Sequence, residues 1–167
     1  SKRYAYVKFL SEKSEICNNS ILQSAARAGD FDYCFKKYTD RDAINAIAQG
    51  AAIGGWYKEA ESIRKEYGVE VDIIAKAAAL GGWLEYAELL HHKHGASIYN
   101  ITEYAALGGH LRQADEMQIK YNVPTSKVVS AAAQGGHHLY CLYQLNYMPD
   151  MLDIIAKTSA EYGYLEF

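Results

Sequence analysis

The sequence predicts an all-α protein, a right-handed α-hairpin solenoid of about five to six helix–turn–helix repeats. Three observations predict this fold. Glycines recur along the chain with a period of 27 residues. Alanine pairs stand at a constant distance before these glycines. Helix-forming residues dominate, because alanine is abundant and the 167 residues include only two prolines.

The buried face of each first helix is predicted from three columns of the repeat. The glycine column contains Gly29, Gly55, Gly82, Gly109, Gly136 and Gly163. Alanine stands three residues before every member, and alanine, or serine at position 159, stands four before. Isoleucine or valine stands eight before. Because residues four apart share a helical face, these columns predict an inward stripe whose small residues let helices approach closely.

The ends of the first helices are predicted from the glycines and from one further column. Ten residues before each glycine stand Asn19, Asn45, Asp72, Tyr99, Ser126 and Asp153. Asn, Asp and Ser are preferred N-cap residues, so we expect them to cap these helices and expect the helix at Tyr99 to begin less cleanly. Each glycine should end its helix, because glycine readily adopts the left-handed conformation.

A second helix is predicted after each glycine turn. The expected ranges are Tyr57–Glu66, Trp83–Lys93, His110–Lys120 and His137–Asn146. A small residue five positions after the glycine predicts a buried column. Its members are Cys34, Ala60, Ala87, Ala114 and Cys141. Short polar links then return the chain, with Gly68 and Gly95 as C-caps and with Pro124 and Pro149 preventing helix continuation.

One repeat cannot bury its own apolar face, so the whole chain, 1–167, is predicted to be a single repeat domain. The repeats lie near 19–44, 45–71, 72–98, 99–125 and 126–152, with partial repeats at 1–18 and 153–167. Within the first, Tyr4–Leu10 is expected to form the second helix of an earlier repeat. Because Leu165 and Phe167 stand mid-repeat, we expect a fragment of a longer protein, or a final half-repeat that acts as a minimal cap.

Several segments resemble ankyrin repeats. Residues 105–111 (Ala-Ala-Leu-Gly-Gly-His-Leu) and 25–31 (Ala-Ala-Arg-Ala-Gly-Asp-Phe) resemble the central Ala-Ala-x-x-Gly-His of that family. Residues 87–90 followed by Gly95-Ala96 resemble its second helix and exit. Two features differ: the Thr-Pro-Leu-His start is absent, and the period is 27 residues rather than about 33. The shorter repeat leaves no room for the β-hairpin finger of the family.

The resemblance implies a protein-binding role without catalysis. Such divergent arrays are similar to those of host-directed proteins of intracellular bacteria and of large DNA viruses. We therefore expect a protein partner and a cytoplasmic location, in the host cytosol if the protein is a secreted effector. A structural spacer or targeting arm, serving a catalytic domain outside this chain, stays open as the alternative.

Composition argues against other classes of partner. The net charge of −3 gives no basic surface for nucleic acid, and the basic residues are scattered rather than gathered for an anionic membrane. No apolar run approaches the ~20 residues of a membrane span. Three cysteines without metal-type spacing predict reduced thiols in an intracellular setting.

We expect no catalytic residues, metal, cofactor or small-molecule substrate. His91, His92 and His94 stand together, but only His91 and His94 share a helical face and no further ligand has suitable spacing. Glycine pairs repeat as helix stops rather than forming a phosphate loop. Two interpretations apply to the acidic column Glu61, Glu88 and Asp115: paired carboxylates for acid–base chemistry, or a solvated outer face.

The candidate binding surface combines two columns. One lies six residues before the glycine on the first helices, with Tyr104 beside it; the other follows the glycine directly. The second column is either an aromatic ridge that docks a partner or a row of side chains packing over the glycine turns. The candidate residues are Gln49, Trp56, Lys76, Trp83, Glu103, Tyr104, His110, Ser130 and His137.

Overall fold

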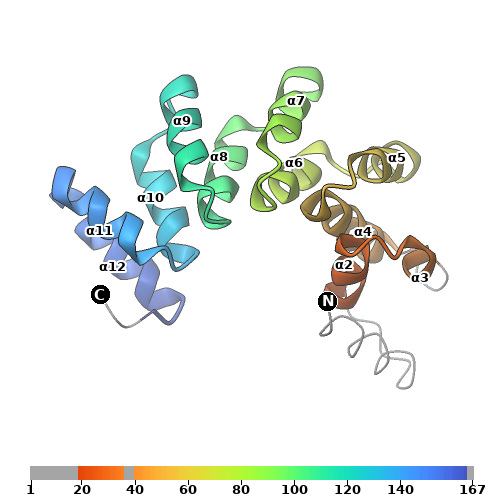
Figure 1. The fold of residues 1–167 in the computed structure, drawn as a ribbon, viewed down its shortest axis with the longest axis horizontal. Helices are drawn as coiled ribbons and strands as arrows, with labels where there is room; N and C mark the ends of the chain where they lie inside the picture. Colours follow the sequence, from red (N-terminus) through yellow and green to blue (C-terminus); the bar gives the residue numbers. More distant parts are fainter. Residues whose placement is uncertain (1–18, 36–39, 165–167) are drawn as a thin grey trace. The chain divides into compact units, whose positions relative to one another are not determined.

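The computed structural model describes residues 19–35 and 40–164, and every regular element in these ranges is helical (Figure 1). They form two compact units, one ending at Ala96 and one beginning at Ser97. The first unit contains α2 (Asn19–Arg27), α3 (Phe31–Phe35), α4 (Arg41–Gly54), α5 (Tyr57–Tyr67), α6 (Val71–Leu80) and α7 (Leu84–His94). The second contains α8 (Ile98–Leu107), α9 (Leu111–Tyr121), α10 (Thr125–Gln134), α11 (His138–Tyr147), η1 (Pro149–Met151) and α12 (Leu152–Glu161).

Within each unit the first helices of successive repeats pack on one another in chain order. In the first unit α4 packs between α2 and α6, and in the second α10 packs between α8 and α12 (Figure 1). In the described residues, the first helices α2, α4, α6, α8 and α10 are each followed, after a glycine turn, by a second helix that packs against it. The all-α class is therefore confirmed. None of the helices in the described ranges has both the length and the apolar character to cross a membrane.

The predicted small-residue core is confirmed. The alanine pairs from 25–26 to 132–133 have no exposed surface, and neither do the five residues of the small second-helix column. Gly50 shows how closely the first helices approach, because a Cβ atom added there would lie 2.2 Å from the carbonyl oxygen of Gln23. Small side chains thus set the distance between neighbouring repeats.

The glycine turns also form as predicted. The six glycines of the column have φ angles between 76° and 86°. After α4, the amide of Trp56 donates to the carbonyl of Ala51, at 2.9 Å, and the amide of Gly55 donates to that of Ala52. This pair of bonds is the Schellman motif, which requires the left-handed conformation at the glycine. Gly68 and Gly95 are left-handed C-caps as well.

The predicted N-cap column is wrong. Asn45, Asp72, Ser126 and Asp153 lie inside their helices, while Asn19 is the first described residue of α2. The links explain the earlier starts. The links were expected to be polar, but one residue in each of three links is apolar and packs into the core. The next helix begins two residues after it. These buried link residues are Val69, Ala96 and Val123.

The expectation for the helix at Tyr99 is also wrong. Its helix, α8, has a side-chain cap, because the hydroxyl of Ser97 accepts from the amide of Asn100 at 3.4 Å. By contrast, α6 and α10 begin after Glu70 and Pro124 without a side-chain cap bond. The segments Tyr4–Leu10 and 165–167, about which the sequence made predictions, lie outside the described residues.

Candidate protein-binding surface

The four predicted residues of the first-helix column six before the glycine, Gln49, Lys76, Glu103 and Ser130, are partly exposed. Three of these side chains bond to the neighbouring first helix. Gln49 accepts a hydrogen bond from Gln23 at 2.9 Å. Glu103 lies 2.7 Å from the Lys127 ammonium. The Ser130 hydroxyl lies 3.2 Å from that of Thr158.

Lys76 and Tyr104 complete the first-helix candidates. Lys76 is half-buried on α6. The column beside it is buried at Gly50, Ala77 and Ala131, and a Cβ atom added to Gly50 would meet the adjacent first helix. Only Tyr104 of that column adds a large side chain to the surface.

A groove of about 400 Å³ crosses the first helices of the second unit. Three of the predicted residues, Glu103, Tyr104 and Ser130, lie together in its wall. The full lining is Glu103, Tyr104 and Leu107 of α8, Ser126, Lys127, Ser130, Ala131 and Gln134 of α10, and Ile154 of α12. The lining includes both apolar and polar side chains, so the groove offers hydrophobic contact and hydrogen bonds.

Leu107, Lys127, Gln134 and Ile154 line this groove but were not among the predicted binding residues. The helical period relates their positions to the predicted column. They stand two or nine residues before their glycines, and the predicted column stands six before. Positions spaced three or four apart lie on one helical face.

A second groove, of about 310 Å³, lies between α2 and α4 in the first unit. It contains Gln49 and is lined by Asn19, Ser20, Gln23, Asp42, Asn45, Ala46 and Gln49. Its side chains are mostly carboxamides, which can both donate and accept hydrogen bonds. Among the described residues, the buried Oδ1 atom of Asn45 has no hydrogen-bond partner.

The column after the glycine packs over the turn of the preceding repeat at Trp56, Trp83 and His137, as the second of its two interpretations describes. The indole of Trp56 donates to the carbonyl of Arg27 at 3.2 Å, and that of Trp83 donates to Ile53 at 2.9 Å. A Cβ atom added to Gly55 would lie 2.8 Å from the Trp83 ring. Both indoles remain 40% exposed.

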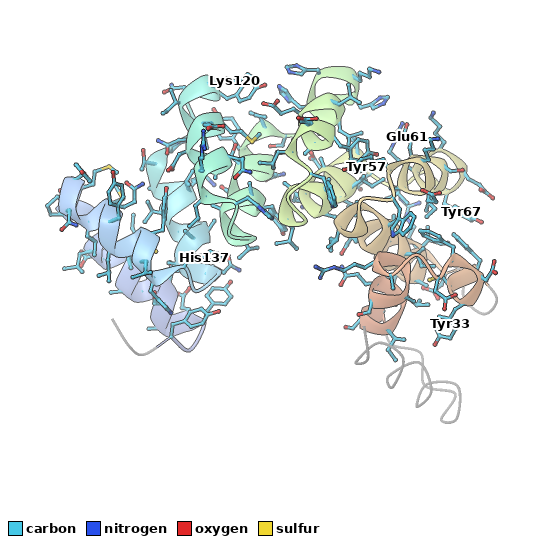
Figure 2. All side chains as sticks on the ribbon, in the orientation of Figure 1. Tyr33, Tyr57, Glu61, Tyr67, Lys120 and His137 are labelled. Atoms are coloured by element: carbon cyan, nitrogen blue, oxygen red, sulfur yellow. The ribbon has the colours of Figure 1, made fainter. Side chains whose placement is uncertain are left out.

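The two histidines of this column differ from the tryptophans in size but not in position. His137, labelled in Figure 2, has its Nε2 atom 3.1 Å from the carbonyl oxygen of Leu107 and its ring over Gly109. His110 precedes α9 and is partly buried. Trp56, Trp83 and His137 thus connect neighbouring repeats, and the exposed part of each indole is also accessible to a partner.

The acidic column is not a solvated face. The carboxylate of Glu61, labelled in Figure 2, lies 2.7 Å from the guanidinium of Arg64, 3.5 Å from the Lys65 ammonium and 3.8 Å from the His94 ring. The hydrogen bond from Arg64 holds the pKa of Glu61 below its ordinary value, against the opposing effect of burial. Asp115 accepts a 2.5 Å hydrogen bond from the Tyr140 hydroxyl. Each carboxylate has its own partners, as in structural ion pairs.

The buried titratable groups near these helices are held in their neutral forms. Burial, with the Glu61 carboxylate as the second cause, raises the pKa of Tyr86 to about 12. Burial raises the pKa of the Cys141 thiol to about 11. At neutral pH this thiol is protonated and therefore a weak nucleophile. Among the described residues, no group of three or more His, Cys, Asp or Glu side chains could hold a metal ion.

Comparison of the chain with family models, with curated proteins and with solved structures finds no match. The likeness to ankyrin repeats therefore stays a prediction.

Proposed function

We propose that this chain is a non-catalytic protein-interaction module, an ankyrin-like solenoid that binds an extended segment of a partner protein across its first helices. The main observation that supports the proposal is the groove of the second unit. Three successive first helices contribute to it, so it follows the stacking direction of the repeats. Extended surfaces of this kind are what repeat proteins use for binding.

The division of the repeat into invariant and variable positions supports the same function. The alanine and glycine columns, nearly identical from repeat to repeat, are buried or form turns. The groove column six residues before the glycine is variable: Gln49, Lys76, Glu103 and Ser130 are four different residues in successive repeats. Varying these side chains changes the surface without changing the packing that holds the helices together.

The chemistry of the lining suits a peptide. Tyr104, Leu107 and Ile154 offer apolar contact for one or two side chains. Ser126 and Gln134 offer hydrogen bonds to a backbone. The Glu103–Lys127 ion pair lies at the surface, with the lysine side chain 54% exposed, so either charge can also meet a charge on the ligand.

Selection of peptides from a random display library on the purified chain tests this function. Tyr104→Ala should weaken binding of the selected peptides at least about tenfold, because it removes the largest side chain of the groove. The matched control is Tyr99→Ala, on the same helix but outside the groove, where Tyr99 is 46% exposed. Equal binding by both variants, or no selected peptide at all, would show that this groove is not the binding surface.

A further inference from the structure

The outer face of α11 has a composition unlike that of the other second helices. Residues 138–147 include no Asp, Glu, Lys or Arg, whereas α5, α7 and α9 each contain several. Four large side chains of α11 are exposed: Leu139 by 84%, Leu142 by 47%, Tyr143 by 56% and Tyr147 by 69%. Contiguous exposed apolar side chains of this kind mark interaction surfaces.

The repeat register shows that packing within the chain does not require this apolar face. Leu139, Tyr143 and Tyr147 are spaced four apart and lie on one side of α11. The equivalent positions of the other three second helices are exposed, and seven of the nine are charged. They are Lys58, Ser62 and Glu66 on α5, Glu85, Leu89 and Lys93 on α7, and Arg112, Glu116 and Lys120 on α9.

The two tyrosines are already ordered against each other. Their ring centroids lie 5.0 Å apart with an interplanar angle of 57°. A pre-ordered aromatic pair loses little side-chain entropy when it is covered. The face formed by Leu139, Tyr143 and Tyr147, hereafter the α11 face, is therefore suited to association.

We propose that the α11 face pairs with the same face of a second copy of this chain, with the two helices antiparallel about a two-fold axis near Tyr143. In a two-fold interface each surface meets itself, so a charged face places like charges together. The outer faces of α5, α7 and α9 would do so, and the α11 face does not. Its neutral surface is complementary to its own copy and offers no charge to orient a charged partner.

The spacing of the side chains fits this arrangement. Leu139 and Tyr147 lie four residues on either side of Tyr143. Antiparallel pairing places Leu139 of one copy against Tyr147 of the other and Tyr143 near its own copy. Since the ten residues of α11 span only about 15 Å, the contact is smaller than a standard interface, and we expect weak self-association with a Kd of about 0.1–1 mM.

Sedimentation velocity of the full chain from about 10 µM to about 1 mM tests the pairing. We expect a monomer–dimer equilibrium that Tyr143→Lys weakens at least about tenfold, because it places two lysines together. The matched control, Leu89→Lys, introduces the same lysine at the equivalent exposed position of α7 and should leave the equilibrium unchanged. A monomer at every concentration, or an equal effect of both variants, overturns the proposal. A monomer is also the result expected if the face binds an apolar helix of another protein instead.

Cysteine cross-linking with a short bismaleimide tests the orientation. In a Cys17→Ser background, Tyr143→Cys should cross-link to itself, and Leu139→Cys should cross-link to Tyr147→Cys when the two variants are mixed. Leu139→Cys that cross-links efficiently to itself would mean parallel pairing and would overturn the antiparallel arrangement. The substituted side chains are exposed, so circular dichroism should show unchanged helix content. This proposal does not depend on the groove of the second unit.

Discussion

At the scale of single residues, the glycine of a turn and the residue after the next turn are in contact at Gly29, Gly55, Gly109 and Gly136. Gly55 has a φ of 82° and lies under the ring of Trp83, which stands 28 positions later in the chain. The glycine is needed both for the turn and for the space it leaves. Trp83, predicted as a candidate binding residue, therefore joins two repeats, and its indole hydrogen bond to Ile53 is part of that junction.

Comparing two glycines separates these requirements. Gly55→Ala should lower the free energy of unfolding by about 2–4 kcal/mol, because the left-handed conformation costs an alanine about 1–2 kcal/mol and its Cβ would also overlap the Trp83 ring. Gly95→Ala has a similar φ of 74° but no atom within 4 Å, so it should cost only about 1–2 kcal/mol. Urea unfolding of both variants measures the difference, and equal losses would show that the ring contact adds nothing.

The Glu61 cluster predicts a pH dependence of stability. The folded-state pKa of Glu61 is lowered, chiefly by the hydrogen bond from Arg64, so its contribution is fully present above the ordinary glutamate pKa and is lost as pH falls through the depressed value. Glu61→Gln should therefore destabilise the protein at pH 7 by about 1 kcal/mol, and its stability should approach that of the wild type at pH 3. Urea unfolding at both pH values measures this, with Glu85→Gln, an exposed glutamate on α7, as the control. A deficit that persists undiminished at pH 3 would contradict the assignment.

At the scale of the helices, interiors, C-terminal ends and the starts of the second helices were predictable, whereas the starts of the first helices were not. Buried columns and glycine stops depend on residue types that act locally. The starts depend on a link residue such as Val69 or Ala96 that packs into the core, so that α6 and α8 begin two positions further on. Whether an apolar residue in a short link is buried depends on its neighbours in space, which the repeat pattern alone does not show.

The observed caps give a test at this scale. The side chain of Asp40 accepts hydrogen bonds from the amides of Asp42 and Ala43, so Asp40→Ala should cost about 1 kcal/mol of stability. Glu70, which precedes α6, makes no side-chain cap bond, and Glu70→Ala should cost little. Thermal or urea unfolding of the two variants compares them. An equal loss would mean that the Asp40 bonds do not act as a cap.

At the scale of the molecule, the described residues form two compact units in which first helices pack in chain order. Each unit has a groove on its first helices, one rich in carboxamides and one with apolar and charged lining. The two proposed surfaces lie on different helices, the peptide groove on α8, α10 and α12 and the self-pairing face on α11. Their tests are therefore independent.

The sequence by itself determined the period of 27 residues, the pairing of helices, the small buried columns and the left-handed glycines. These features follow from the helical period and from the conformational freedom of glycine, which act within a few residues. Only the tertiary structure decided that Trp83 covers Gly55, that Glu103 pairs with Lys127 and that Leu107 and Ile154 share a groove. These contacts join different repeats, and they depend on how closely the helices of neighbouring repeats approach.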